Sequence, residues 1–287
     1  MSDLTLDGLR YANAEQIFEV ENRNGLPCLS YPLIESTGIV RHLFTTRLGG
    51  VSEGMCSTLN LSYERGDDPE AVLENYRRVA AAMGVELSDM VCTQQTHTTN
   101  IRVATRKDGG KGVTRKLDYC DIDGLITNER GLCLCAFYAD CVPLYFVDPV
   151  HKAIGLSHSG WKGTVQRMGQ VTLDRMKEAF GTSPEDVYAA IGPSICQDCY
   201  EVSDDVIDRI KEAFDPVWHD TLFRPNDRKR YQLNLWKACE ITLLEAGVRK
   251  EHLAVTNLCT SCNKEYLFSH RATRGRRGNL GAFLCLK

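Results

Sequence analysis

Three short apolar segments follow one another between residues 133 and 157, with no helical pattern between them. Residues 133–138, 142–147 and 153–157 are rich in apolar side chains, and Asp148-Pro149 predicts a turn before the third segment. Strands joined by turns pair in antiparallel or mixed sheets, whereas a doubly wound parallel sheet needs a helix after each strand. The segment therefore favours an α+β architecture over a regular doubly wound fold.

Helical periodicity is found on both sides of these strands. Apolar residues recur at helical spacing over 70–83, and Pro69 and Gly84 provide start and stop signals. The same reasoning predicts three more helices and two more strands: helices near 163–180, 203–214 and 234–246, and strands at 187–191 and 282–286. No repeat or long linker divides the 287 residues. We therefore expect one domain over 1–287, built from layered mixed β-sheets flanked by helices.

The charge balance and the apolar runs narrow the class of protein. The chain has 34 Lys and Arg against 38 Asp and Glu, a net charge of −4, which disfavours a surface built to track nucleic acid. The longest apolar run, LCLCAFYA at 132–139, is far shorter than the roughly 20 residues that span a bilayer. The N-terminal residues lack the basic-then-apolar pattern of a secretory signal. We expect a cytoplasmic protein with neither nucleic acid nor membrane as partner.

Three segments place a metal-capable side chain beside small or polar residues at a predicted strand end. His97 ends TQQTH, Cys141 ends ADC, and His158 begins HSGWKG. Two imidazoles and a thiolate suit Zn²⁺, and three protein ligands leave one position open for catalysis. The spacing alone also fits a buried thiol and two hydrogen-bonded histidines. A third alternative makes Cys141 a thiolate nucleophile, with a histidine as base and Asp140 or Asp123 as orienting group.

The 13 cysteines include two Cys-x-x-Cys pairs, Cys196/Cys199 and Cys259/Cys262. Two such pairs can build a structural four-cysteine zinc site. Here 59 residues separate Cys199 from Cys259, which is far more than the usual loop of a zinc ribbon. The sequence alone therefore favours incidental thiols over a joint site.

Arginines occur in two contexts that suit an anion. Arg47 lies beside the glycine-rich turn Gly49-Gly50, where a guanidinium can bind a phosphate or simply form a surface salt bridge. The stretch RATRGRRGN begins at Arg271 and contains four arginines in seven residues. A solvated loop with one or two arginines turned toward the site is the favoured interpretation.

Several ordered motifs together resemble one known family. They are NLS at 60–62, GDDPEAVLENYRR at 66–78, QQTH at 94–97, DGLIT at 123–127, ADCVPLYFVDP at 139–149, HSGWKGT at 158–164 and IGPSICQDCYEV at 191–202. Cys259-Thr260 followed by FSHR at 268–271 completes the pattern. The chain resembles the laccase-domain family, also called multicopper polyphenol oxidase proteins, from about residue 44 to its end. Members of this family are described as zinc-dependent purine nucleoside phosphorylases.

The resemblance assigns roles to particular residues. The metal-binding positions of the family fall on His97, Cys141 and His158, and its early arginine, implicated in holding phosphate or substrate, falls on Arg47. The resemblance also implies a fold similar to that of bacterial toxin deamidases. Within the matching motifs we expect further roles as follows: catalysis by Arg47, Asp140 and Cys141, and substrate binding by Arg47, Gln95, Lys162 and Arg271.

The chain departs from the family pattern in places. Ser159 and Lys162 replace the usual Ala and Arg, and Gly278-Asn279 stands near the position of the usual Gly-Arg. His270 has no clear family counterpart and is a further candidate for a ligand or a base. Substrate preference carried by the C-terminal loop can therefore differ in this chain.

The resemblance implies phosphorolysis of adenosine, inosine or methylthioadenosine with zinc as cofactor, and deamination of adenosine as a further activity. Phosphate attacks the anomeric carbon while the purine departs, so the enzyme must position phosphate and stabilise the leaving base. Alternatives that keep the same site are an amide hydrolase dependent on cysteine or zinc, and a binding module with a structural metal. Seven histidines are too few for a four-copper oxidase centre.

Overall fold

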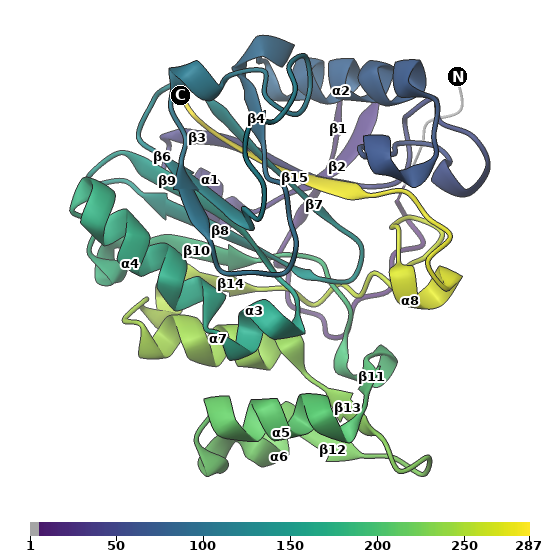
Figure 1. Cartoon of the computed structure of the whole chain (residues 1–287), viewed down its shortest axis with the longest axis vertical. Helices are drawn as coiled ribbons and strands as arrows, with labels where there is room; N and C mark the ends of the chain where they lie inside the picture. Colours follow the sequence, from purple (N-terminus) through teal and green to yellow (C-terminus); the bar gives the residue numbers. More distant parts are fainter. Residues whose placement is uncertain (1–5) are drawn as a thin grey trace.

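Two six-stranded mixed β-sheets form the centre of the computed structural model, which describes residues 6–287 (Figure 1). The sheets pack face to face, and helices cover the outer face of each sheet. This layered arrangement confirms the α+β architecture expected from the sequence. Among the described helices, none is both long enough and apolar enough to cross a bilayer.

The first sheet brings the C-terminal strand into its middle. Its strand order is β1-β2-β3-β15-β7-β4, and all neighbours are antiparallel except β4 and β7. Its strands are β1 (Glu19–Arg23), β2 (Leu26–Ser30), β3 (Val40–Thr45), β15 (Leu280–Leu286), β7 (Cys133–Tyr138) and β4 (Met90–Cys92). The strands expected at 133–138 and 282–286 are thereby confirmed.

The second sheet has the strand order β14-β10-β8-β9-β6-β5, with parallel pairing at both ends and antiparallel pairing between. Its strands are β14 (Leu253–Val255), β10 (Tyr188–Ile191), β8 (Val142–Asp148), β9 (Ala153–Ser159), β6 (Gly124–Thr127) and β5 (Ile101–Val103). The expected strands at 142–147, 153–157 and 187–191 correspond to β8, β9 and β10. The chain passes from the first sheet to the second through residues 139–141.

Strand β15 shows why the central strands are almost continuously apolar. Leu280, Ala282 and Leu284 pack between the two sheets, while Phe283 and Cys285 pack under the helix on the outer face. Because side chains alternate across a strand, a strand buried on both faces needs apolar residues at every position. Each large side chain buried in this way contributes about 1.5–3 kcal/mol to folding.

Helix α2 (Pro69–Met83) covers the first sheet, as the periodicity over 70–83 predicts. The Asp68 side chain caps its N-terminus by accepting a hydrogen bond from the Glu70 amide at 3.1 Å. Gly84 ends it in the left-handed conformation with φ +63°. The cap and the stop signal fix both ends of α2 at the positions expected from the sequence.

The second sheet is covered by α4 (Met168–Phe180) and α7 (Leu235–Glu245). The prediction of one continuous helix over 163–180 is wrong, because α3 (Trp161–Val165) ends before α4 begins. Arg167 separates them with φ +59°. Two glycines, Gly163 and Gly169, flank the break, and glycine lowers helix stability by about 1 kcal/mol.

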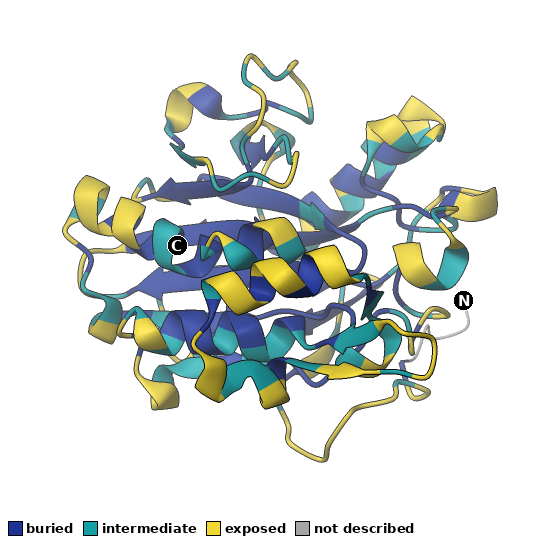
Figure 2. Ribbon diagram, turned by 60° about the horizontal axis from the view of Figure 1, so that its bottom comes forward, coloured by how far each residue is buried: buried dark blue, intermediate teal, exposed yellow. Residues whose placement is uncertain are grey.

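A small third sheet projects from the second layer of helices (Figure 1). It contains β11 (Glu201–Val202), β13 (Tyr231–Leu233) and β12 (Phe223–Pro225), and it lies beside α5 (Asp204–Ala213) and α6 (His219–Leu222). The remaining short helices are α1 (Pro32–Glu35) and α8 (His270–Thr273). Figure 2 shows buried residues concentrated in the two large sheets, with exposed residues on the outer sides of the helices.

Candidate metal centre and cavity

A cavity of about 220 Å³ opens beside the crossing from β7 to β8. Three stretches that are distant in sequence form its wall: the turn at 61–65, the segment 92–97 after β4, and the C-terminal segment 277–279. The lining combines aromatic rings with charged groups and with the predicted metal ligands. The members that carry the argument below are Glu64, Arg65, His97, Phe137, Tyr138, Cys141, His158, Arg277 and Asn279.

The three predicted metal ligands come together at one end of this cavity. His97 lies in the loop after β4, Cys141 in the crossing between the sheets, and His158 on β9. Their ligand atoms all lie within 4.8 Å of one another, and Cys141 Sγ is 3.7 Å from His97 Nε2. The two imidazole rings meet edge to face, with centroids 4.9 Å apart. The grouping inferred from the motifs is therefore present in the structure.

The carboxylate of Asp123 holds both histidines in place. Oδ1 accepts hydrogen bonds from the His97 amide at 3.0 Å and from His158 Nδ1 at 2.8 Å. The Thr96 and Thr98 amides donate to Oδ2, each at 3.0 Å. These bonds stabilise the left-handed backbone of His97, whose φ is +68°, an uncommon value for a residue with a side chain. Asp123, considered as an orienting group from the sequence, lies behind the metal ligands rather than among the residues that line the cavity.

Charges within this cluster shift its protonation equilibria. Burial alone would raise the pKa of Asp123, but hydrogen bonds from His158 and from backbone amides lower it to about 2. Burial would also raise the pKa of the Cys141 thiol, yet the neighbouring His158 and His97 lower it to about 6. Burial opposes protonation of His158, but Cys141 and Asp123 raise its pKa to about 9. Without a metal, the cluster therefore holds a thiolate beside an imidazolium.

The donor set and the space around it fit a divalent metal ion. Two imidazole nitrogens and one thiolate are ligands that Zn²⁺ accepts readily, and three protein ligands leave one position open. Gly160 borders the site, and a Cβ there would lie 2.8 Å from His97 Cδ2 and 3.1 Å from Cys141 Sγ. The hydrogen bond from His158 Nδ1 to Asp123 leaves Nε2 as the ligand atom. His97, Cys141 and His158 could thus hold the metal that the family resemblance implies.

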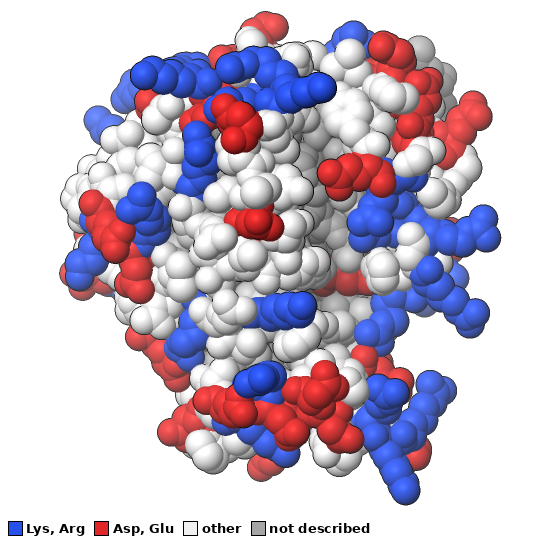
Figure 3. Space-filling view, in the orientation of Figure 1, with Lys and Arg blue, Asp and Glu red and all other residues white. Residues whose placement is uncertain are grey.

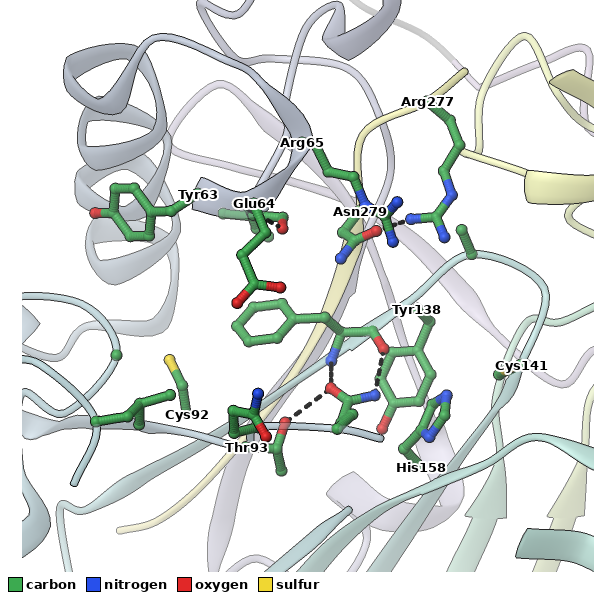
Figure 4. Close-up of a pocket in the computed structure, with 18 of the residues that line it drawn as sticks. Tyr63, Glu64, Arg65, Cys92, Thr93, Tyr138, Cys141, His158, Arg277 and Asn279 are labelled. Atoms are coloured by element: carbon green, nitrogen blue, oxygen red, sulfur yellow. Dashed lines mark hydrogen bonds between the residues drawn. The ribbon is translucent and has the colours of Figure 1, made fainter. Parts of the chain in front are cut away.

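Two arginines face the other end of the cavity. Arg277 is buried, and its Nε finds no hydrogen-bond partner in residues 6–287. Its guanidinium donates to Asn279 Oδ1, and Figure 4 shows Arg65 pointing to the same place. Burial and the nearby Arg65 lower the pKa of Arg277 to about 10. No carboxylate of the described chain forms an ion pair with either arginine, so this corner offers positive charge to an anion.

Neither Arg65 nor Asn279 was predicted from the sequence. Arg65 lies between two of the family motifs, and only its charge beside Gly66 could have marked it. Asn279 was noted as a departure from the family pattern, without a role. Arg277 belongs to the arginine-rich run, from which one or two side chains were expected to reach the site. Figure 3 shows Lys and Arg side chains gathered over the α8 side of the molecule.

Gln95 and Asp140 lie at the site but are held by protein groups. The Gln95 side chain accepts from the Phe137 amide and donates to the Phe137 carbonyl, both at 2.8 Å. The buried Asp140 carboxylate accepts from Thr260 Oγ1 and from the Arg271 amide, both at 2.6 Å. Gln95 lines the cavity and Asp140 does not. Both brace the loops that carry the metal ligands.

The other predicted site residues lie outside the cavity lining. Arg47 donates to the carbonyls of Ser57 and Lys264, and its guanidinium lies 4.7 Å from the centre of the Phe268 ring. Lys162 is exposed on α3.

Helix α8 carries Arg271 and His270, and both side chains are exposed. The Arg271 guanidinium donates to the carbonyls of Cys199 and Glu201. Burial of part of its ring and the charge of Arg277 lower the pKa of His270. Arg47 and Arg271 thus donate to backbone carbonyls, whereas Arg65 and Arg277 line the cavity.

The two Cys-x-x-Cys pairs also come together, although their separation in sequence argued against a joint site. Their four Sγ atoms lie within 4.8 Å of one another, outside the cavity described above. The residues between the two pairs form the third sheet and helices α5, α6 and α7. After these elements the chain returns to the place that it left after β10. Pairing of β10 with β14 brings the two ends together.

Known proteins are similar to this chain in sequence and in fold. The chain is 35% identical over 245 residues to purine nucleoside phosphorylase YlmD of Bacillus subtilis, covering 85% of this chain and 87% of that protein. It is 37% identical over 278 residues to YlmD of Geobacillus stearothermophilus, covering 93% and 96%. The crystal structure of the latter superposes with a TM-score of 0.87 over 95% of this chain and 100% of that one, at 35% identity.

A further relative carries a different activity in its name. Adenosine deaminase RL5, from an unknown prokaryotic organism, is 31% identical over 230 residues, covering 79% of this chain and 87% of that protein. The family model described as multi-copper polyphenol oxidoreductase laccase matches residues 41–287. The motifs, the fold and these similarities agree, and the chain belongs to the multi-copper polyphenol oxidoreductase laccase family.

Proposed function

We propose that this protein cleaves purine nucleosides with phosphate, using a zinc ion held by His97, Cys141 and His158. The observation that carries the proposal is the pairing, in one cavity, of this ligand set with the arginine corner formed by Arg65 and Arg277. A phosphorylase needs both an anion site and a group that stabilises the departing base. The relatives named purine nucleoside phosphorylase support the same activity.

In this proposal Arg277 and Arg65 bind phosphate and orient one of its oxygens toward the anomeric carbon of the ribose. The new bond joins that oxygen to C1′ while the bond from C1′ to the purine nitrogen breaks with its electron pair. The leaving purine takes up a proton. The Arg277 guanidinium is buried and bonded to Asn279 before the reaction, so it stabilises phosphate at a small cost of reorganising solvent.

The aromatic and acidic lining residues suit the nucleoside. Phe137 lines the cavity, and we assign its ring to stacking against the purine. Glu64 is the single carboxylate among the described lining residues, and Figure 4 shows its side chain directed toward the part of the cavity lined by Cys92 and Thr93. We assign it to the ribose hydroxyls, which are hydrogen-bond donors that a carboxylate accepts.

When bound, zinc would supply a Lewis acid that polarises substrate or water. The chain itself contributes Asp123, which fixes the orientation of both histidines, and Gly160, which leaves room for them. We propose adenosine, inosine and methylthioadenosine as substrates and the cytoplasm as the location. The expected roles of Asp140 and Gln95 become those of positioning residues in this proposal.

Deamination of adenosine is a second candidate activity, because the relative RL5 is named adenosine deaminase. The same cavity would serve, since deamination needs water and no phosphate. An amide hydrolase with Cys141 as nucleophile also uses these residues, because the lowered pKa of the thiol favours the reactive thiolate. Phosphorolysis needs phosphate, deamination forms inosine from adenosine without phosphate, and an amide hydrolase leaves nucleosides unchanged, so one assay separates the three reactions.

The test incubates zinc-loaded protein with each nucleoside, with and without phosphate, and follows free base, inosine and sugar phosphate by chromatography. We expect base and sugar phosphate in equal amounts only when phosphate is present. His97→Ala should abolish the reaction, while His151→Ala, a histidine outside the cavity lining, should leave it intact. Inosine formed from adenosine without phosphate would favour the deaminase, and inert nucleosides would direct the search to amides.

A further inference from the structure

The four cysteines of the two Cys-x-x-Cys pairs lie close together, outside the lining of the cavity. Cys196 and Cys199 begin and end the 3-10 turn that follows β10, and Cys259 and Cys262 belong to the loop that follows β14. Cys199 Sγ lies 3.5 Å from Cys262 Sγ, and Cys196 Sγ lies 4.0 Å from the same atom. All four Sγ atoms lie within 4.8 Å of one another.

These distances match a metal site better than a pair of disulfides. Sulfur atoms around a tetrahedral zinc stand about 3.8 Å apart, because each Zn–S bond is about 2.3 Å. A disulfide would require about 2.05 Å, and all four residues are free cysteines in the structure. The spacing between the sulfurs is therefore that of a four-thiolate centre.

Backbone hydrogen bonds point to the same chemistry. The amides of Cys196 and Cys262 both donate to Cys259 Sγ, at 3.2 and 3.4 Å. Such amide donors stabilise a thiolate, which is the form that binds a metal. The Cys262 bond closes its own Cys-x-x-Cys turn, and the Cys196 bond joins the two turns, so the backbone positions Cys259 Sγ between them.

We propose that Cys196, Cys199, Cys259 and Cys262 bind a second zinc ion, separate from the one at His97, Cys141 and His158. Four protein ligands leave no open position, so the role of this ion is structural. It would join the segment after β10 to the loop after β14, close to the place where the chain leaves the second sheet after β10 and rejoins it in β14. Metal binding would thereby close that long excursion at its base.

The proposed ion also supports the catalytic end of the cavity. Thr260 lies between Cys259 and Cys262 and donates to Asp140 Oδ1 at 2.6 Å. Asp140 immediately precedes Cys141, and its Oδ2 accepts from the Arg271 amide. The Arg271 guanidinium in turn donates to the Cys199 carbonyl. Loss of the second ion should therefore loosen the loop that carries Cys141.

Metal content of the full chain, purified under reducing conditions, tests the proposal. We expect two zinc ions per chain in the wild type, and one in Cys259→Ser or Cys196→Ser. The matched control is Cys120→Ser, because Cys120 is an exposed thiol outside the cluster, and this variant should keep two. Equal zinc in the wild type and in both cluster variants would overturn the proposal.

A second measurement covers the case in which the cysteine variants fail to fold. His97→Ala removes a ligand of the other site only, so this variant should fold and keep one ion. Replacing that ion with Co²⁺ should give the intense absorption of a tetrahedral four-thiolate complex. Folded His97→Ala protein that binds no Co²⁺ at thiolates, or whose four cysteines form disulfides by intact mass, would contradict the proposed site.

Discussion

The Asp123 carboxylate accepts a hydrogen bond from His158 Nδ1 at 2.8 Å, and the same oxygen accepts the backbone amide of His97 at 3.0 Å. One buried side chain therefore orients two of the three predicted metal ligands, although Asp123 itself touches no metal position. Partners of this kind fix the tautomer and the ring orientation of a ligating histidine.

Asp123→Asn should weaken metal binding by about 10–100-fold, the range typical for loss of such a partner. An amide retains one acceptor oxygen, and its NH₂ would face amides that are themselves donors. Competition with a chelator measures the affinity. Asp121→Asn is the matched control, because its carboxylate bonds Thr96 Oγ1 at the surface. Unchanged affinity in Asp123→Asn would show that the carboxylate does not position the ligands.

Gly160→Ala should impair metal binding and activity while the protein stays folded. Its Cβ would lie 2.8 Å from His97 Cδ2, closer than such contacts allow, so the His97 ring must move. Gly163→Ala is the control, since its nearest neighbours stand at 3.6 Å, an ordinary contact distance. Zinc content and circular dichroism of both variants provide the measurement. A Gly160→Ala protein with normal zinc content would mean that the ligand loop adapts without cost.

The metal-free protein should alkylate at Cys141 in acidic solution where ordinary thiols are inert. The pKa of Cys141 is lowered to about 6 on folding, so its stabilising contribution is present at high pH and is lost as the pH falls through about 6. His158 is raised to about 9, so its contribution is present at low pH and is lost as the pH rises through about 9. The Cys141 thiolate and the His158 imidazolium therefore coexist between about pH 6 and pH 9, while their two effects on the stability of the metal-free fold have opposite pH dependences.

Iodoacetamide labelling followed by mass spectrometry of the Cys141 peptide measures this titration. The labelling rate should have its midpoint near pH 6, and zinc should protect the thiol. His158→Gln removes the main cationic partner, so the midpoint should rise by more than one pH unit. A midpoint near pH 8.5 in the unmodified chain would refute the thiolate–imidazolium pair.

Arg277→Gln should raise the KM for phosphate by about tenfold to a hundredfold, since a hydrogen bond to a charged group contributes about 1.5–3 kcal/mol. The KM for the nucleoside should change much less. The neighbouring Arg276 is exposed and absent from the cavity lining, so Arg276→Gln is the matched control. Equal effects of the two substitutions would place the phosphate elsewhere.

The sequence predicted the strands that form the centre of both sheets, because a strand buried on both faces leaves a nearly unbroken apolar run. It also predicted the grouping of His97, Cys141 and His158, through the motifs that contain them. It missed Arg65, whose approach to Arg277 depends on a contact across 212 residues of chain. Local patterns carry no information about such a pairing.

Arg47 and the two Cys-x-x-Cys pairs also show that local sequence cannot report tertiary contacts. Arg47 has the local surroundings of an anion site, yet tertiary contacts bind its guanidinium to the Ser57 and Lys264 carbonyls. The two Cys-x-x-Cys pairs are too far apart to resemble a zinc ribbon, yet β10 and β14 bring them together. Contacts of the guanidinium with backbone carbonyls decide the first outcome, and the pairing of β10 with β14 decides the second.

Phosphate dependence of base release is the most direct test of the central claim. Zinc-loaded protein should release adenine or hypoxanthine from its nucleoside in proportion to bound phosphate, with one sugar phosphate formed for each base. The reaction should stop when phosphate is removed and resume when it is restored. Base release at the same rate without phosphate, or no base release in a fully zinc-loaded protein, would contradict the account.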